Sequence, residues 1–234
     1  MLAVAGGKGG CGKTTTTLGL AAALVRQRKS AVAVDTDREM PNLHAMAGVG
    51  RVPGLDAVAD GWPPEFVAGT AEAPALGVEV IPAASGPGTD DLANPSRSEP
   101  TAGLARVRNS AAVLLDCPAG AGPDAVAPLR VADAAVVVTT AEPACLRDAA
   151  KTAAMARELD APVAGAVVSR AAEVPEGLDR LLDCPVLGVV PDADVEGPSE
   201  TGTATDTLAT DPLAADEVRA AHDRILSALQ PKYL

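Results

Sequence analysis

The feature that most constrains this chain is a glycine-rich stretch, GKGGCGKT, which begins at Gly7. It matches the phosphate-binding pattern G-x-x-x-x-G-K-[ST], in which backbone N–H groups close around a polyphosphate because glycine has no Cβ. Lys13 then supplies a positive charge to the outer phosphates, and the Thr14 hydroxyl can ligate Mg²⁺. Lys8 is a second lysine that this task does not need, which indicates a further role. The residues expected to contact the phosphates are Gly7, Lys8, Gly9, Gly10, Cys11, Gly12, Lys13, Thr14 and Thr15.

The segments on either side fit such a loop. Residues 2–5 form a short apolar run that predicts a buried strand, and residues 15–28 carry apolar side chains at helical spacing. A strand, a glycine loop and a helix in this order place an anion at a helix N-terminus, where free N–H groups and the helix dipole stabilise it. The order of elements therefore favours a phosphate site over an ordinary glycine-rich turn.

Short apolar runs recur along the chain, with helical patterns between them. Such runs are typical of strands buried on both faces of a parallel sheet. We therefore expect an α/β fold in a single domain, residues 1–234, with a mostly parallel, twisted sheet of about seven to eight strands and helices on both faces. The predicted strands are residues 2–5, 31–34, 77–82, 111–116, 134–140, 162–169 and 185–190.

Helices and loops fill the intervals. Two stretches, residues 83–101 and 191–212, are rich in Gly, Pro, Ser and Asp and are expected to be loops. Ligands of open α/β sheets bind beyond the carboxyl ends of the strands, so the loops that leave the last two predicted strands are candidate nucleotide contacts. Beyond residues 15–28, helices are predicted at residues 146–159, 176–182 and 214–229.

Composition narrows the function. The net charge is −12, only five residues are lysine, and no basic run exists, which disfavours a nucleic-acid partner. An acidic, lysine-poor chain is typical of a protein that stays soluble at high salt, although a GC-rich genome would give the same bias. The four cysteines have no C-x-x-C spacing, so no local zinc motif is present. With no signal peptide and no apolar run of ~18 residues, we expect a cytoplasmic protein and leave peripheral contact with a membrane open.

Three acidic residues lie where predicted strands end. Asp35 and Asp37 follow the second strand, and Asp116 ends the fourth. An aspartate at the end of an apolar strand can hold Mg²⁺ directly or through water, so Asp35 and Asp116 join Thr14 as candidate metal residues. Hydrolysis also needs a carboxylate that orients or deprotonates the attacking water, and Asp37 is the candidate for that role.

Four segments together carry a resemblance to a known family: KGGCGKTT, DTDREMPNLHAMAGV, LLDCPAG and VVTTAEPACLRDAAKT. They are similar to the MinD/ParA family of deviant Walker ATPases, most of all to archaeal MinD-like proteins, over residues 1 to 197. The resemblance implies a P-loop NTPase fold, binding of ATP and Mg²⁺, and a sandwich homodimer that holds two ATP molecules at its interface.

The resemblance also implies roles for single residues. Lys8 matches the lysine that reaches the partner's nucleotide, and Lys13 and Thr14 match the phosphate and Mg²⁺ residues. Asp37 matches the switch-I aspartate that handles the attacking water, which makes Lys8, Lys13 and Asp37 the implied catalytic set. The other implied contacts are Asn42 in switch I, Asp116 at the metal, Gly120 as the switch-II sensor of the γ-phosphate, and Pro191 with Asp192 near adenine and ribose.

Two departures from the family pattern matter. Many relatives have asparagine where the sixth strand ends, whereas this chain has Ser169-Arg170, so selectivity against GTP stays open and stacking of Arg170 on the base is an alternative. MinD itself ends in a basic amphipathic helix that docks on membrane. Here Pro231 is expected to stop the last helix, whose basic residues are few, so the C-terminus does not support membrane contact. His222 on that helix is expected to be solvated.

The function expected from the resemblance is that of an ATP-driven switch with a slow basal rate. An unidentified protein partner stimulates hydrolysis, and the output is spatial positioning of cell division or other machinery. Two alternatives stay open: a ParA-type partition ATPase, which the acidic charge disfavours, and an ATPase of metal-cofactor assembly, whose relatives carry a close cysteine pair that this sequence lacks.

Overall fold

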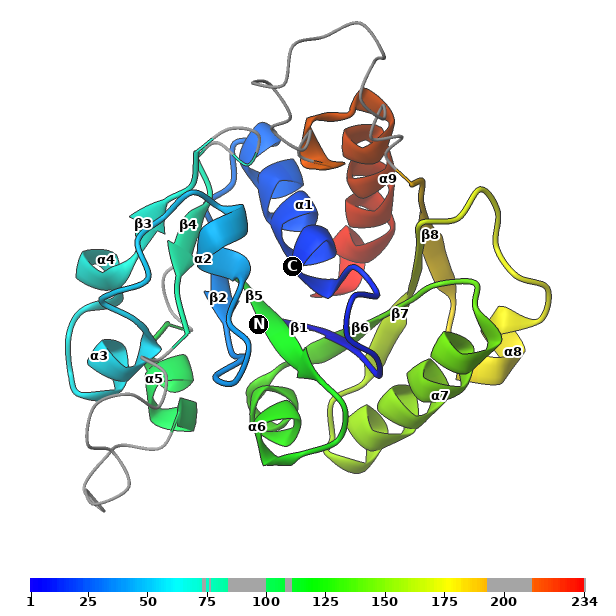
Figure 1. The fold of residues 1–234 in the computed structure, drawn as a ribbon, viewed down its shortest axis with the longest axis horizontal. Coiled ribbons are helices and arrows are strands. Elements are labelled where there is room, and N and C mark those ends of the chain that lie inside the picture. The colour runs from blue at the N-terminus through cyan, green and yellow to red at the C-terminus, as the bar shows by residue number, and fades with distance from the viewer. Residues whose placement is uncertain (73–74, 76, 84–99, 108–110, 193–211, 234) are drawn as a thin grey trace, which may run out of the picture.

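The computed structural model describes residues 1–234 except 73–74, 76, 84–99, 108–110, 193–211 and 234. The described part forms an eight-stranded sheet in the order β3-β4-β2-β5-β1-β6-β7-β8 (Figure 1). Neighbouring strands pair in parallel, except that β3 runs antiparallel to β4. The strands are β1 (Leu2–Gly6), β2 (Ala31–Asp35), β3 (Gly69–Thr70), β4 (Glu79–Ile81), β5 (Ala112–Ala119), β6 (Ala134–Thr139), β7 (Val163–Ser169) and β8 (Val186–Val190).

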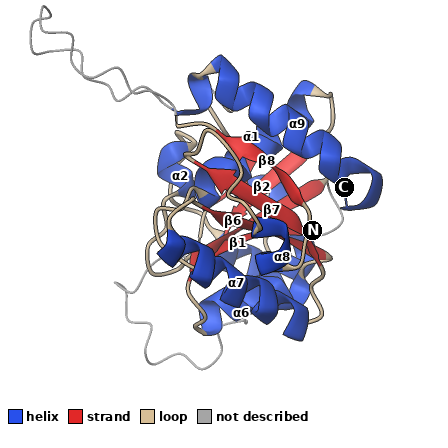
Figure 2. Cartoon of the chain, turned by 90° about the vertical axis from the view of Figure 1, so that its right-hand side faces the viewer, coloured by secondary structure: helices blue, strands red, loops and turns tan. Residues whose placement is uncertain are grey.

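Helices cover both faces of the sheet. Figure 2 shows α1 and α9 on one face and α6 and α7 on the other. Small aliphatic side chains fill both interfaces, since the chain has one Trp, one Tyr and one Phe. The helices are α1 (Lys13–Arg26), α2 (Leu43–Met46), α3 (Leu55–Ala59), α4 (Pro64–Val67), α5 (Pro100–Val107), α6 (Pro123–Val131), α7 (Pro143–Glu158), α8 (Leu178–Leu182) and α9 (Asp216–Tyr233), with a 3₁₀ turn at Pro212–Ala214.

The structure confirms the predicted fold class and each of the seven predicted strands. The strand that the sequence did not reveal is β3, which has two residues and lies at the edge of the sheet beside β4. So short a segment has no periodicity of its own, and its pairing depends on the neighbouring strand. No helix in the described residues is long and apolar enough to span a bilayer.

Several element boundaries differ from the prediction. The strand expected to end at residue 116 continues to Ala119, because Gly6 of β1 pairs with Ala119. Helix α5 begins at Pro100, inside a stretch expected to be loop. The prediction that Pro231 stops the last helix was wrong, since α9 extends to Tyr233. A proline so close to the helix end removes one of the last hydrogen bonds only.

The strand order places the candidate site. Strand β1 lies between β5 and β6, so the loop after β1 opens at the carboxyl edge of the sheet beside the end of β5. Strands β2 and β5 are neighbours, and Asp35 is the register partner of Asp116. Parallel strands bring their carboxyl ends to one edge, so the two acidic strand ends and the glycine loop converge there.

Candidate functional site

The glycine loop occupies the turn between β1 and α1, and its backbone conformations explain its glycines. Gly10 and Gly12 have φ values of +73° and +91°, a region in which a side chain would be strained. Gly7 is needed for space, because a Cβ there would lie 2.5 Å from the Cβ and backbone oxygen of Asp148 on α7. Helix α1 then begins at Lys13 with Gly12 as its N-cap, so the loop delivers the start of a 14-residue helix to the site.

The two lysines of the loop lie in different environments. Lys13 is 9% exposed, and its ammonium donates a hydrogen bond to the backbone oxygen of Lys8 over 3.2 Å. The Lys8 side chain is 49% exposed, and its Nζ lies 3.3 Å from the Glu142 carboxylate at the N-terminus of α7. The hydrogen bond to Glu142 raises the pKa of Lys8, and the same bond lowers the pKa of Glu142. Lys13 therefore points into its own loop, whereas Lys8 stands at the surface.

The acidic strand ends form the buried floor of the site. Asp116 is 3% exposed and accepts hydrogen bonds from the hydroxyls of Thr14 (2.7 Å) and Thr17 (3.3 Å). Burial raises the pKa of Asp116 to about 7, and the nearby charge of Asp35 adds to this shift. Burial also raises the pKa of Asp35 to about 6. Two carboxylates so placed repel each other, and a cation between or beside them would relieve that repulsion.

This donor set fits Mg²⁺, which prefers carboxylate, hydroxyl and water oxygens. The Thr14 hydroxyl touches both Asp116 and the Asn42 side-chain oxygen, at 2.7 and 3.0 Å. Both oxygens of Asp35 already accept backbone N–H groups, from Asp37 and Leu43. Asp35 is thus better suited to hold a water of a hydrated ion than to bind the ion directly. The oxygens of Asp116 accept hydroxyl groups, from Thr14 and Thr17, instead of backbone N–H groups. A hydroxyl can rotate away when an ion binds, so Thr14 and Asp116 are the residues suited to bind the ion directly.

The segment that follows β2 is shaped by Asp37. One oxygen of Asp37 accepts the backbone N–H groups of Glu39 (3.2 Å) and Met40 (2.9 Å), which shapes the loop at residues 37–40. Among the described residues, none donates a hydrogen bond to the other carboxylate oxygen. Gly120, after β5, has a φ of +92° and open space where a Cβ would be. The positive φ would strain any residue with a side chain at this position, so the loop requires glycine for its backbone conformation and not for space.

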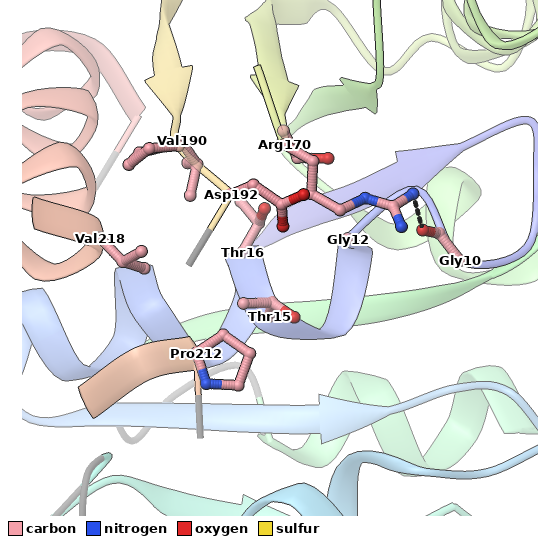
Figure 3. A pocket seen from close by; sticks show the side chains of 11 residues that line it. Gly10, Gly12, Thr15, Thr16, Arg170, Val190, Asp192, Pro212 and Val218 are labelled. Carbon is pink, nitrogen blue, oxygen red and sulfur yellow. Dashed lines mark hydrogen bonds between the residues drawn. The ribbon is translucent and has the colours of Figure 1, made fainter. Parts of the chain in front are cut away.

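A pocket of about 170 Å³ opens beside the start of α1, and Figure 3 shows its lining. Arg170, Pro191 and Asp192, the residues expected near the base, all line it. Thr15 and Thr16 of α1 form another part of the wall. The predicted loop contacts after β7 and β8 therefore meet the glycine loop at one cavity, although residues 193–211 of the second loop lie outside the described part of the chain.

Most of the predicted site residues converge at this edge of the sheet. Cys11 lies in the loop with a buried thiol, which faces the backbone oxygen of Val138 at 3.5 Å. Sequence reasoning missed Glu142, the partner of Lys8, and Ser169, which binds the loop backbone. It also missed Thr17 as a donor to Asp116. A signal for Glu142 was present, since it lies two residues after the predicted strand at residues 134–140, whose end reaches the same edge.

Comparisons with known proteins agree with this geometry. Residues 2–201 match the family described as the CobQ/CobB/MinD/ParA nucleotide binding domain. An uncharacterized ATP-binding protein of Methanocaldococcus jannaschii is 31% identical over 235 residues, which cover 97% of this chain and 88% of that protein. The septum site-determining protein MinD of Synechocystis sp. is 31% identical over 209 residues, which cover 82% of this chain and 76% of that protein.

Solved structures share the fold. The cell division ATPase MinD of Pyrococcus furiosus superposes with a TM-score of 0.77 at 24% identity and covers 98% of both chains. The septum site-determining protein MinD of Pyrococcus horikoshii, complexed with Mg-ADP, gives a TM-score of 0.77 at 22% identity and covers 98% of this chain and 95% of that one. The phosphate-binding loop, the acidic strand ends and the family match over residues 2–201 lead to one conclusion: the chain belongs to the CobQ/CobB/MinD/ParA family of P-loop nucleotide-binding ATPases.

Proposed function

We propose that this protein is a molecular switch that binds ATP with Mg²⁺, closes into a homodimer over two nucleotides, and returns to the monomer after hydrolysis. The observation that carries the proposal is that the two lysines of the loop lie in different environments. Lys13 is buried against its own loop, whereas Lys8 stands half exposed at the surface and pairs with a surface carboxylate, that of Glu142. A cation in that place can exchange Glu142 for a phosphate held by a second copy.

The chemistry of hydrolysis follows from the residues at the strand ends. Lys13 and the N–H groups at the start of α1 would hold the phosphates of ATP in line. Thr14 and Asp116 would hold Mg²⁺ with Asp35 nearby, and the ion would supply positive charge to the phosphates. Asp37 has a carboxylate oxygen available to orient the attacking water, and its other oxygen fixes the switch-I loop. Gly120 and Asn42 belong to the loops that would respond to the γ-phosphate.

The biological output that we propose is spatial positioning of cell division or other cellular machinery. Support comes from the 31% identity to the MinD protein of Synechocystis sp.. On this account the basal rate is slow and an unidentified protein partner stimulates it. A net charge of −12 weighs against the alternative of a DNA-bound partition ATPase. A role in metal-cofactor assembly is the second alternative, and the sequence lacks the close cysteine pair that would favour it.

Two substitutions test the switch. Lys13→Ala removes the phosphate-facing charge, so ATP affinity should fall roughly a hundredfold, about 2.7 kcal/mol. Asp37→Ala should leave ATP binding intact and slow hydrolysis, so that the dimer accumulates at saturating MgATP. Size-exclusion chromatography with light scattering measures the dimer, and titration calorimetry measures affinity. Asp37→Ala in MgADP is the matched control and should stay monomeric.

Equal monomer fractions for the wild type and Asp37→Ala at saturating MgATP would contradict the switch. Fast turnover by the isolated protein would point to another class of ATPase. The cellular role needs separate assays: flotation with lipid vesicles tests membrane contact, and a DNA mobility shift at two salt concentrations tests the partition alternative. A pull-down with the Asp37→Ala protein in MgATP is the experiment that can identify the stimulating partner.

A further inference from the structure

Two residues at the end of β7 and just after it donate hydrogen bonds to the backbone of the glycine loop. The buried hydroxyl of Ser169 donates a hydrogen bond to the backbone oxygen of Cys11 over 2.5 Å. The guanidinium of Arg170 donates to the backbone oxygen of Gly10 over 2.6 Å, as Figure 3 shows. Two consecutive side chains thus hold two consecutive carbonyl groups, from positions about 160 residues apart in the sequence.

Holding these carbonyl groups also orients the N–H groups that matter for phosphate. In a trans peptide the C=O and the N–H point in opposite directions. The oxygen of Gly10 shares its peptide with the N–H of Cys11, and the oxygen of Cys11 shares its peptide with the N–H of Gly12. When Arg170 and Ser169 draw the two oxygens toward β7, both N–H groups turn to the other side, away from β7. N–H groups held in one direction are what a polyphosphate needs.

The backbone conformations of Arg170 and Gly12 permit these two hydrogen bonds. Arg170 itself has a φ of +51°, a conformation that costs a residue with a side chain roughly 1 kcal/mol or more. A Cβ on Gly12 would lie 2.9 Å from the Ser169 hydroxyl, so this glycine permits the close approach. A strained residue and a close approach meet where the side chains of Ser169 and Arg170 contact the loop. Such strain indicates a functional position when the surroundings enforce it.

We propose that Ser169 and Arg170 are positioning residues that hold the segment Gly10–Gly12 ready for the phosphates of the nucleotide. Arg170 therefore sets affinity for the polyphosphate, through the loop, and its contribution does not depend on the base. This differs from stacking of Arg170 on the base, which would act on the nucleoside end of the ligand alone. The inference rests on the proposed function, because it assumes that ATP occupies the loop.

The test compares two ligands, MgATP and magnesium tripolyphosphate, in titration calorimetry. Arg170→Ala should weaken both by the same factor, about five- to tenfold, since a charge-assisted hydrogen bond to the loop is lost. Arg170→Lys should recover most of the affinity for both ligands, because an ammonium group can still donate to the Gly10 oxygen. Ser169→Ala should weaken both ligands in the same way. The rate at saturating ATP should change less than the KM.

Arg180→Ala on α8 is the matched control, since it removes an exposed arginine outside the site and should leave both affinities unchanged. Thermal unfolding of each variant checks that the fold is intact. A loss confined to ATP, with tripolyphosphate unaffected, would assign Arg170 to the base and overturn the inference, as would unchanged binding of both ligands. Failure of the wild type to bind either ligand would instead overturn the proposed function, and the inference with it.

Discussion

At the scale of single residues, the pair of buried carboxyl groups at the carboxyl edge of the sheet lowers the stability of the folded protein. Asp116 and Asp35 are register partners on adjacent strands, and both are almost fully buried. Burial raises the pKa of each group, so without a bound cation both carboxyl groups keep their protons to a higher pH in the folded protein than in the unfolded chain. The two buried carboxyl groups thus lower the stability of the folded protein at the site where we propose that a cation and phosphates bind.

This cost predicts an unusual pH dependence for Asp116→Asn. The pKa of Asp116 is raised to about 7 in the folded protein, whereas it is about 4 in the unfolded chain. Between about pH 4 and pH 7 the unfolded chain releases this proton more readily, so the wild type loses stability as the pH rises through this range and loses no more above it. The variant carries no such charge. Without nucleotide it should therefore be more stable than the wild type at about pH 8, by on the order of 2 kcal/mol, and the excess should shrink toward pH 4.

Urea denaturation at several pH values measures this difference. In MgATP the order should reverse, because the ion stabilises the carboxylate of the wild type and has less to bind in the variant. A variant less stable than the wild type at every pH without nucleotide would contradict the account. Thr14 and Thr17 donate to both carboxyl oxygens, and an asparagine side chain keeps an acceptor for one of them.

At the scale of elements, the contact between α1 and α9 differs most from expectation. His222 was expected to be solvated, yet it is fully buried, with its Nδ1 2.8 Å from the Val218 oxygen and its ring against Gly19 of α1. A Cβ on Gly19 would lie 2.5 Å from three ring atoms. An ion pair from Arg26 to Asp223 joins the same two helices at 2.7 Å. The glycine makes room for the imidazole, which local sequence cannot reveal.

The burial of His222 predicts a loss of stability in acid. Burial lowers its pKa to about 4, and the charge of Arg26 acts in the same direction, while the bond to Val218 and the charge of Asp223 oppose it. The unfolded chain binds this proton at about pH 6.5, so the histidine costs stability as pH falls from about 6.5 to 4. His222→Phe should lose less stability than the wild type between about pH 7.5 and 5, by on the order of 2 kcal/mol.

Denaturant titrations at the two pH values give both numbers. Arg224→Ala, an exposed residue of α9, is the control and should follow the wild type. If the wild type and His222→Phe lose equal stability in acid, the histidine is protonated in the folded protein and the burial argument fails. The ion pair between Arg26 and Asp223 is partly exposed and is expected to contribute little to either result.

At the scale of the whole molecule, net charge sets the response to salt. A charge of −12 on 234 residues destabilises the compact state through self-repulsion, which added salt screens. We expect the Tm to rise by about 5 °C between about 0.1 M and 1 M KCl. An uncharged osmolyte at matched osmolality is the control and separates screening from preferential exclusion. A Tm that is flat or falling in KCl would contradict the expected tolerance of high salt.

Much of this protein follows from local patterns in its sequence. The glycine loop, the seven main strands and the acidic strand ends are each visible within about a dozen residues, because periodicity, backbone freedom and strand length are local properties. Parallel topology then brings residues at strand ends to one edge, so the sequence alone predicts that Thr14 and Asp116 lie close together, as they do.

Contacts between distant segments needed the folded chain. Glu142 beside Lys8, Ser169 and Arg170 on the glycine loop, and His222 over Gly19 join residues more than 100 positions apart. Each depends on how one element packs on another, and packing is fixed by the shapes of many side chains at once. Local sequence patterns therefore predicted the kind of ligand that this site binds. The order of the strands and the packing of the helices determined which side chains contact one another there.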